Sequence, residues 1–154
     1  MQLAHLGLLV TVLGVAFTSA YSIEKDVRLA PGETITVNGY AFRFDGVKDH
    51  QGPNYVAQRG TLEVSHDGFV EVLHPEKRIY RVQQNPMTEA AISGNAFRDL
   101  YVALGEPLDA GAWAVRIYHK PMIRWVWFGA LMMALGGLLS ILDKRYRLKV
   151  AGGR

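Results

Sequence analysis

Long apolar runs lie at both ends of the chain, and alternating apolar and polar residues fill the middle. The first run, residues 1–20, contains no Lys, Arg, Asp or Glu, and the second run, residues 125–142, is equally free of charge. At about 1.5 Å per helical residue the second run would extend about 27 Å, close to the hydrocarbon thickness of a bilayer. The pattern therefore predicts two membrane-spanning helices, over residues 1–21 and 122–142.

The middle of the chain, residues 22–121, has the period-two alternation of short strands. Thr34–Val37 and Tyr40–Phe44 alternate on either side of Asn38-Gly39, a type I′ turn sequence, and predict a hairpin. Asp67-Gly68 predicts a second hairpin in the same way. About six to eight short strands with frequent turn signals indicate a small antiparallel β-barrel or sandwich. The predicted fold is a membrane-anchored all-β domain between two transmembrane helices.

Other segments of the middle region have weaker or different patterns. The expected elements are an exposed loop at Asp49–Asn54, a long strand at Tyr55–Ser65 bent at Gly60, a polar connection at Pro75–Arg78, a strand or one helical turn at Thr88–Ile92, and a last strand at Trp113–Tyr118. Phe97, Leu100, Tyr101 and Leu104 fit helical spacing, but the residue types of Leu100–Leu104 favour a strand that stops at Gly105. In the last strand, alternation places Trp113, Val115 and Ile117 on one face.

The tail, residues 143–154, indicates how the chain is oriented. It begins with four basic residues within six positions, which favours a cytoplasmic tail and places residues 22–121 outside the cytoplasm. Three basic residues near the start of the second run, Arg116, Lys120 and Arg124, favour the opposite orientation. The first run could also be a cleaved signal peptide, but nothing cationic precedes Leu3, so a retained span is predicted.

Composition excludes several functional classes. The chain has no cysteine, which excludes disulfides, thiol nucleophiles and redox dithiols within its 154 residues. The formal charge of +3 is small, and no Lys/Arg stripe interleaved with aromatics indicates nucleic-acid binding. No metalloprotease, Ser/His/Asp or Gly-rich phosphate motif is present, so no catalytic residue is predicted.

His5 is the only ionisable side chain in the first run, and a polar residue at membrane depth is a candidate functional site. If Ala20 marks the outer boundary, His5 lies about 22 Å below it. The imidazole could hydrogen-bond to another helix or act as an axial ligand of haem iron. Gly7 and Gly14 lie two turns apart on one side, where a flat group or another helix could approach closely.

The other four histidines give weaker signals. The Asp67-Gly68 turn pairs His66 with Phe69 and separates His66 from His74 by about 16 Å along the ladder, too far to share a metal ion. His50 is expected to be solvated in a loop. His119 is expected at the membrane surface, where it could touch a partner or cofactor.

Many short groups of residues, taken in order over residues 1–147, resemble the C-terminal end of the CcmF/NrfE family of cytochrome c maturation haem lyase subunits. They are His5-Leu6-Gly7, Tyr21-Ser22, Glu24, Asp26-Val27, Gly52-Pro53-Asn54-Tyr55, Pro75-Glu76-Lys77-Arg78, Tyr80, Met87-Thr88-Glu89-Ala90-Ala91-Ile92, Asp99-Leu100-Tyr101, Trp113, Val115-Arg116, Lys120-Pro121, Trp125, Trp127, Gly129, Gly136-Gly137, Asp143 and Arg145-Tyr146-Arg147.

The resemblance implies a multi-pass protein of the bacterial inner membrane, with residues 22–121 in the periplasm. Such a protein takes haem from a periplasmic haem chaperone and, with other haem lyase subunits, directs its covalent attachment to apocytochrome c. The resemblance also implies a resident haem b between two membrane histidines. By position His5 matches the second of these histidines, as an axial ligand of the haem iron.

Family members are several times longer, and their other haem-binding histidines lie upstream of the part that the chain resembles. We therefore expect the chain to be a gene fragment or truncated product that supplies half of the haem site and is inactive alone. The alternative function is a bitopic periplasmic β-domain that binds a protein or envelope partner without a cofactor.

Overall fold

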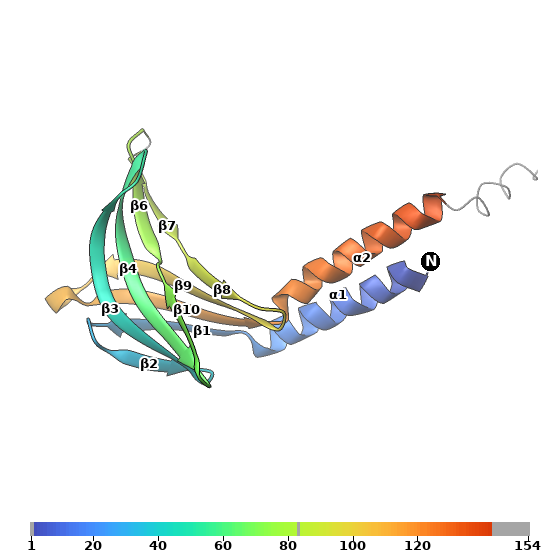
Figure 1. Ribbon diagram of the computed structural model, residues 1–154, viewed down its shortest axis with the longest axis horizontal. Helices are drawn as coiled ribbons and strands as arrows, with labels where there is room; N and C mark the ends of the chain where they lie inside the picture. Colours follow the sequence, from blue (N-terminus) through green and yellow to red (C-terminus); the bar gives the residue numbers. More distant parts are fainter. Residues whose placement is uncertain (1, 83, 143–154) are drawn as a thin grey trace, which may run out of the picture. The chain divides into compact units, whose positions relative to one another are not determined.

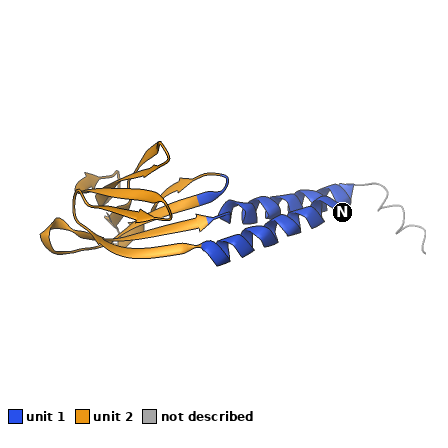
Figure 2. Ribbon diagram, turned by 90° about the horizontal axis from the view of Figure 1, so that it is seen from below, with its two compact units in different colours: residues 1–21, 96–98, 121–154 blue, residues 22–95, 99–120 orange. Residues whose placement is uncertain are grey.

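The computed structural model describes residues 2–82 and 84–142. The described residues form two compact units (Figure 2). A helical unit contains residues 2–21, 96–98 and 121–142, and a β unit contains residues 22–95 and 99–120. The predicted basic tail, residues 143–154, lies outside the described residues.

The helical unit is built on α1 (Gln2–Tyr21) and α2 (Ile123–Leu142). Strands make up most of the rest of the described chain: β1 (Ile23–Leu29), β2 (Thr34–Val37), β3 (Tyr40–Gln51), β4 (Tyr55–His66), β5 (Phe69–Leu73), β6 (Glu76–Tyr80), β7 (Pro86–Glu89), β8 (Ala91–Gly94), β9 (Arg98–Pro107) and β10 (Trp113–Pro121). A short 3₁₀ turn, η1 (Asp109–Gly111), joins β9 to β10.

The strands form two sheets (Figure 1). One sheet has the order β1-β10-β9-β8, and the other has the order β2-β3-β4-β6-β7, with β5 also paired to β4. Apolar side chains from both sheets meet in one buried core: Leu29, Val37, Phe42, Phe44, Leu62, Val64, Leu73, Leu100, Val102, Leu104, Trp113, Val115 and Ile117. The β unit is therefore a sandwich, as the alternating pattern predicted.

Both predicted hairpins are confirmed. Val37 pairs with Tyr40 across Asn38-Gly39, and His66 pairs with Phe69 across Asp67-Gly68. Asn38 and Asp67 adopt φ values of 50° and 44°, the left-handed conformation that a type I′ turn requires of its first central residue. Residues 113, 115 and 117 are buried together, as expected for the last strand.

Three expectations for local structure were wrong or incomplete. The expected loop at Asp49–Asn54 begins later, because β3 continues to Gln51 in register with β4. The expected polar connection at Pro75–Arg78 is largely strand β6, whose charged side chains pair across the sheet. Thr88–Ile92, left open between strand and helix, contributes to two strands, β7 and β8.

Strand β4 changes partner at Gly60. Residues Tyr55–Arg59 pair with β6 and residues Leu62–His66 pair with β5, so the same edge of β4 pairs with two strands in succession. The Gly60 N–H donates to the carbonyl of Pro75 at 2.8 Å. A side chain at position 60 would lie 3.1 Å from Leu104 of the opposite sheet, so the close approach of the two sheets favours glycine here.

Candidate functional site

Small residues hold the two helices together in the helical unit. A Cβ at Gly7 would lie 2.7 Å from the carbonyl oxygen of Gly129, and a Cβ at Gly14 would lie 2.8 Å from the backbone nitrogen of Val126. Such close approach is typical of glycine-containing helix pairs in membranes. The sequence did not decide whether a flat group or another helix approaches the glycine face of α1. In the structure, α2 covers this face.

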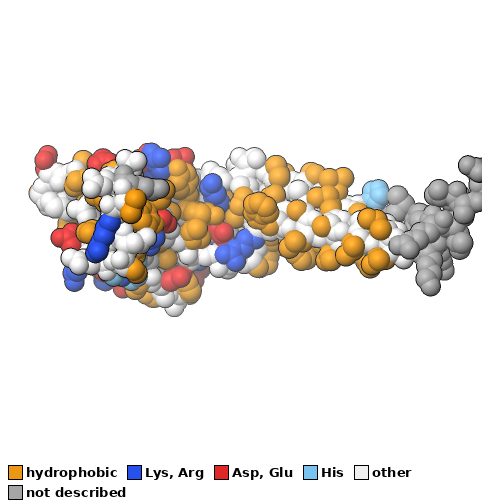
Figure 3. All heavy atoms as spheres, turned by 90° about the horizontal axis from the view of Figure 1, so that it is seen from above, with side chains coloured by type: hydrophobic (Ala, Val, Ile, Leu, Met, Phe, Trp, Pro, Cys, Tyr) orange, Lys and Arg blue, Asp and Glu red, His pale blue; other side chains and the backbone are white. Residues whose placement is uncertain are grey.

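His5 lies on a different face of α1. At about 100° per residue, His5 is turned about 200° from Gly7, and it is exposed. It lies in a shallow apolar depression on α1 together with Gln2, Leu3, Leu6 and Leu9. Hydrophobic side chains cover much of the helix pair in Figure 3. The imidazole is therefore presented outward from the pair, within an apolar surface.

The helices offer one side chain that could serve as an axial ligand of haem iron. Imidazole is a standard axial ligand of haem iron, and His5 is the only histidine in the sequence of α1 and α2. On α2, the Cβ of Met132 and the backbone nitrogen of Met133 lie against the position of Gly7, so both residues are at the contact between the helices. Within the described residues, no group of three or more His, Cys, Asp and Glu side chains could hold a metal ion.

The histidines of the β unit have structural environments that the sequence did not predict. His119 is buried rather than at an exposed interface, and Asn38 Nδ2 lies 3.1 Å from its Nε2. His66 stacks on Tyr40 with ring centroids 4.2 Å apart, and its Nδ1 lies 2.9 Å from the carbonyl oxygen of Gly39. His50 belongs to strand β3 and not to a loop.

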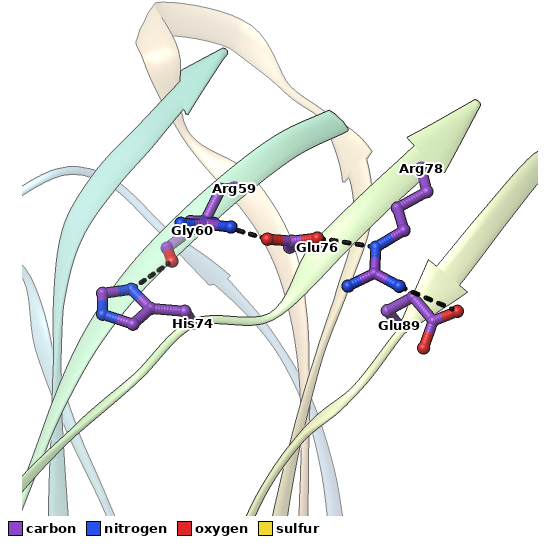
Figure 4. Close-up of polar contacts among 6 residues, drawn as sticks. All are labelled: Arg59, Gly60, His74, Glu76, Arg78 and Glu89. Atoms are coloured by element: carbon purple, nitrogen blue, oxygen red, sulfur yellow. Dashed lines mark hydrogen bonds and ion pairs between the residues drawn. The ribbon is translucent and has the colours of Figure 1, made fainter. Parts of the chain in front are cut away.

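A charged network crosses the sheet at the point where β4 changes partner (Figure 4). The buried carboxylate of Glu76 accepts from Arg59 Nε at one oxygen and from Arg78 Nε, at 2.6 Å, at the other. Arg78 also lies 3.6 Å from Glu89 and stacks over the ring of Tyr55 at 4.5 Å. These contacts join β4, β6 and β7 side by side.

Electrostatics keep Glu76 ionised despite its burial. Burial alone would raise the pKa of this carboxyl, but the hydrogen bonds from Arg78 and Arg59 outweigh it and hold the pKa below its usual value. The network was not predicted from the sequence, because Arg59 is 17 positions from Glu76 and Glu89 is 11 positions from Arg78. The available signal was the spacing of Glu76 and Arg78, which places both on one face of a strand.

Comparison with known proteins identifies the β unit. Residues 20–121 match a family model described as the CcmF C-terminal beta-sandwich. The chain is 56% identical to the cytochrome c-type biogenesis protein CcmF of Pseudomonas aeruginosa, over 97% of the chain and 23% of that protein. It is 53% identical to CcmF of Escherichia coli, over 98% of the chain and 24% of that protein.

More distant relatives agree with this match. The cytochrome c-type biogenesis protein NrfE of Haemophilus influenzae is 34% identical, over 94% of the chain and 23% of that protein. Among solved structures, a cytochrome c haem lyase CcmF superposes with a TM-score of 0.73 at 22% identity, over 88% of the chain and 23% of that structure, and so has the same fold. The chain spans about a quarter of the length of these relatives. It belongs to the CcmF family of cytochrome c-type biogenesis proteins.

Proposed function

We propose that this chain contributes one axial ligand, His5, to a haem b held within the membrane by a haem lyase subunit that acts in cytochrome c maturation. The observation that carries the proposal is the direction of His5: it faces away from α2, on an apolar helix surface where further helices could complete a pocket. Two helices cannot enclose a macrocycle, so the second ligand and most of the pocket would come from segments other than α1 and α2. When bound, the haem supplies one-electron redox chemistry.

The length and the apolar composition of the two helices support a membrane location. Both α1 and α2 are 20 residues long and apolar enough to cross a bilayer. We propose that residues 1–21 and 122–142 span the bacterial inner membrane, that residues 22–121 lie in the periplasm, and that the tail, residues 143–154, is cytoplasmic. In this topology His5 is far from the periplasmic surface, so it would serve a resident haem rather than the haem being attached.

The proposed partners follow from the family. The related proteins are named for cytochrome c-type biogenesis, and one solved relative is named a cytochrome c haem lyase. We infer that the β unit works beside a periplasmic haem chaperone, other haem lyase subunits and apocytochrome c.

The experiment uses a chimera in which this chain replaces the matching quarter of a full-length relative. Membranes of the chimera should show a bis-imidazole b-type haem spectrum, and His5→Ala should abolish it. His50→Ala, in the β unit, is the matched control and should leave the spectrum unchanged. A spectrum that survives His5→Ala would reject His5 as a ligand and favour a β-domain that binds its partner without a cofactor.

A further inference from the structure

Strand β9 has an open edge in the half of the strand that follows Val102. On one side, β10 lies along β9. On the other side, the ladder with β8 ends at the pair Ala91 and Val102, and among the described residues no strand pairs with residues 103–107 there. Strand β7, which precedes β8, pairs with β6 and diverges from β9 (Figure 1). The end of β9 lies beside two surface depressions.

A side chain occupies this open edge. Lys77 of β6 donates from Nζ to the carbonyl oxygen of Gly105 at 3.2 Å and pairs with the carboxylate of Glu106 at 2.5 Å. The N–H and C=O of one residue in an antiparallel strand point to the same side, so the N–H of Gly105 lies on the side from which Lys77 approaches its carbonyl oxygen. Lys77 supplies a donor where a neighbouring strand would otherwise supply a backbone N–H.

Depressions lie on both sides of the edge. One, of about 510 Å³, is apolar and is floored by small residues of the four-stranded sheet, Ala103, Gly105 and Ala114. The other, of about 590 Å³, is more polar and includes Lys77 and Glu106 with Asp49 and Gln58. Thr88 of β7 lines both depressions. Successive side chains of an added strand would point alternately into the two depressions.

We propose that the edge of β9 at residues 103–107 binds an extended polypeptide segment by strand addition, with Lys77 displaced from Gly105. The occupant must offer a free backbone edge, which a folded partner rarely does and an unfolded chain does readily. Before haem is attached, apocytochrome c is such a chain, and this identification of the occupant rests on the proposed function. Backbone pairing gives affinity that tolerates different sequences, and the more apolar depression favours a small or apolar residue at every second position.

The test uses the full chain in detergent micelles and a synthetic peptide that spans the Cys-x-x-Cys-His segment of an apocytochrome c, with serine in place of each cysteine. We expect the peptide to bind and to slow hydrogen exchange of the amides of Ala103 and Gly105, which face the same side of β9. N-methylation of the peptide amides that face β9 should weaken binding about tenfold or more, while N-methylation of the alternate amides should change it little. Strand addition would be overturned if N-methylation at the two sets of positions had the same effect on binding, if protection from exchange appeared elsewhere in the chain, or if the peptide did not bind.

A pair of variants locates the site independently. Thr88→Trp places a bulky side chain beside both depressions and should weaken binding about tenfold. Thr36→Trp is the matched control, because Thr36 is also an exposed threonine on an edge strand, β2, of the same sheet. Equal affinities for the two variants would reject the site. The haem spectrum of His5→Ala does not involve the peptide, so the ligand proposal and the peptide proposal fail separately.

Discussion

Gly136 of α2 packs directly on Ala4 of α1. A Cβ at Gly136 would lie 2.9 Å from the Cβ of Ala4 and 2.6 Å from its backbone nitrogen. His5 is turned about 100° from Ala4 and about 200° from Gly7, so the contacts of Ala4 and Gly7 with α2 leave His5 on another face of α1. The packing of small residues thus determines the side of the helix pair on which the candidate ligand lies.

The first prediction concerns this contact. Gly136→Val should weaken the helix pair by about 1–3 kcal/mol, because backbone atoms of α1 leave no room for the added side chain. Its neighbour Gly137 is a matched control, since a Cβ there meets nothing within 4 Å. Detergent-induced unfolding followed by Trp125 fluorescence measures the difference. Equal unfolding midpoints for Gly136→Val and Gly137→Val would contradict this packing.

The second prediction concerns Glu76. Glu76→Gln should destabilise the β unit by about 2–4 kcal/mol, because it leaves Arg59 and Arg78, both partly buried, without their shared carboxylate. Glu106→Gln removes a carboxylate that is 77% exposed and should cost less than about 1 kcal/mol. Urea unfolding at neutral pH compares the two variants. A cost for Glu76→Gln no larger than that for Glu106→Gln would show that the network is dispensable.

The third prediction is the pH dependence of stability. Because the pKa of Glu76 is lowered in the folded protein, ionised Glu76 stabilises the fold above its ordinary pKa, and this stabilisation is lost as the pH falls through the lowered value. The free energy of unfolding should therefore fall in acid, and less steeply for Glu76→Gln than for the unchanged chain. Parallel curves for the two proteins would mean that Glu76 does not contribute to the acid response.

The fourth prediction separates turn strain from a tertiary contact. Asn38→Ala and Asp67→Ala each place alanine at a left-handed position in a type I′ turn, which costs about 1–2 kcal/mol. Only Asn38 also contacts the buried His119, so Asn38→Ala should cost about 0.5–1.5 kcal/mol more. Thermal unfolding of both variants measures the difference. Equal melting temperatures would assign the whole effect of Asn38→Ala to the turn.

The sequence predicted what local rules control. Asn38-Gly39 and Asp67-Gly68 specify their hairpins through backbone conformation alone, and the alternation of Trp113, Val115 and Ile117 shows which face of the last strand is buried. The prediction from the sequence failed at Glu76, because the charged residues at positions 76–78 indicated a polar connection on the surface. Charge is compatible with a buried strand position only when distant partners neutralise it, and no short stretch of sequence reports such partners.

The amino-acid sequence by itself determined the two apolar helices, the all-β character of the middle region and the family, because hydropathy, turn chemistry and ordered residue matches are all properties of short stretches. Only the tertiary structure decided that α2 covers the glycine face of α1, that His5 lies on another, exposed face, and that Lys77 of β6 reaches the backbone of β9 at Gly105. Each of these depends on the rotation or register of one element against another, which packing between distant residues sets.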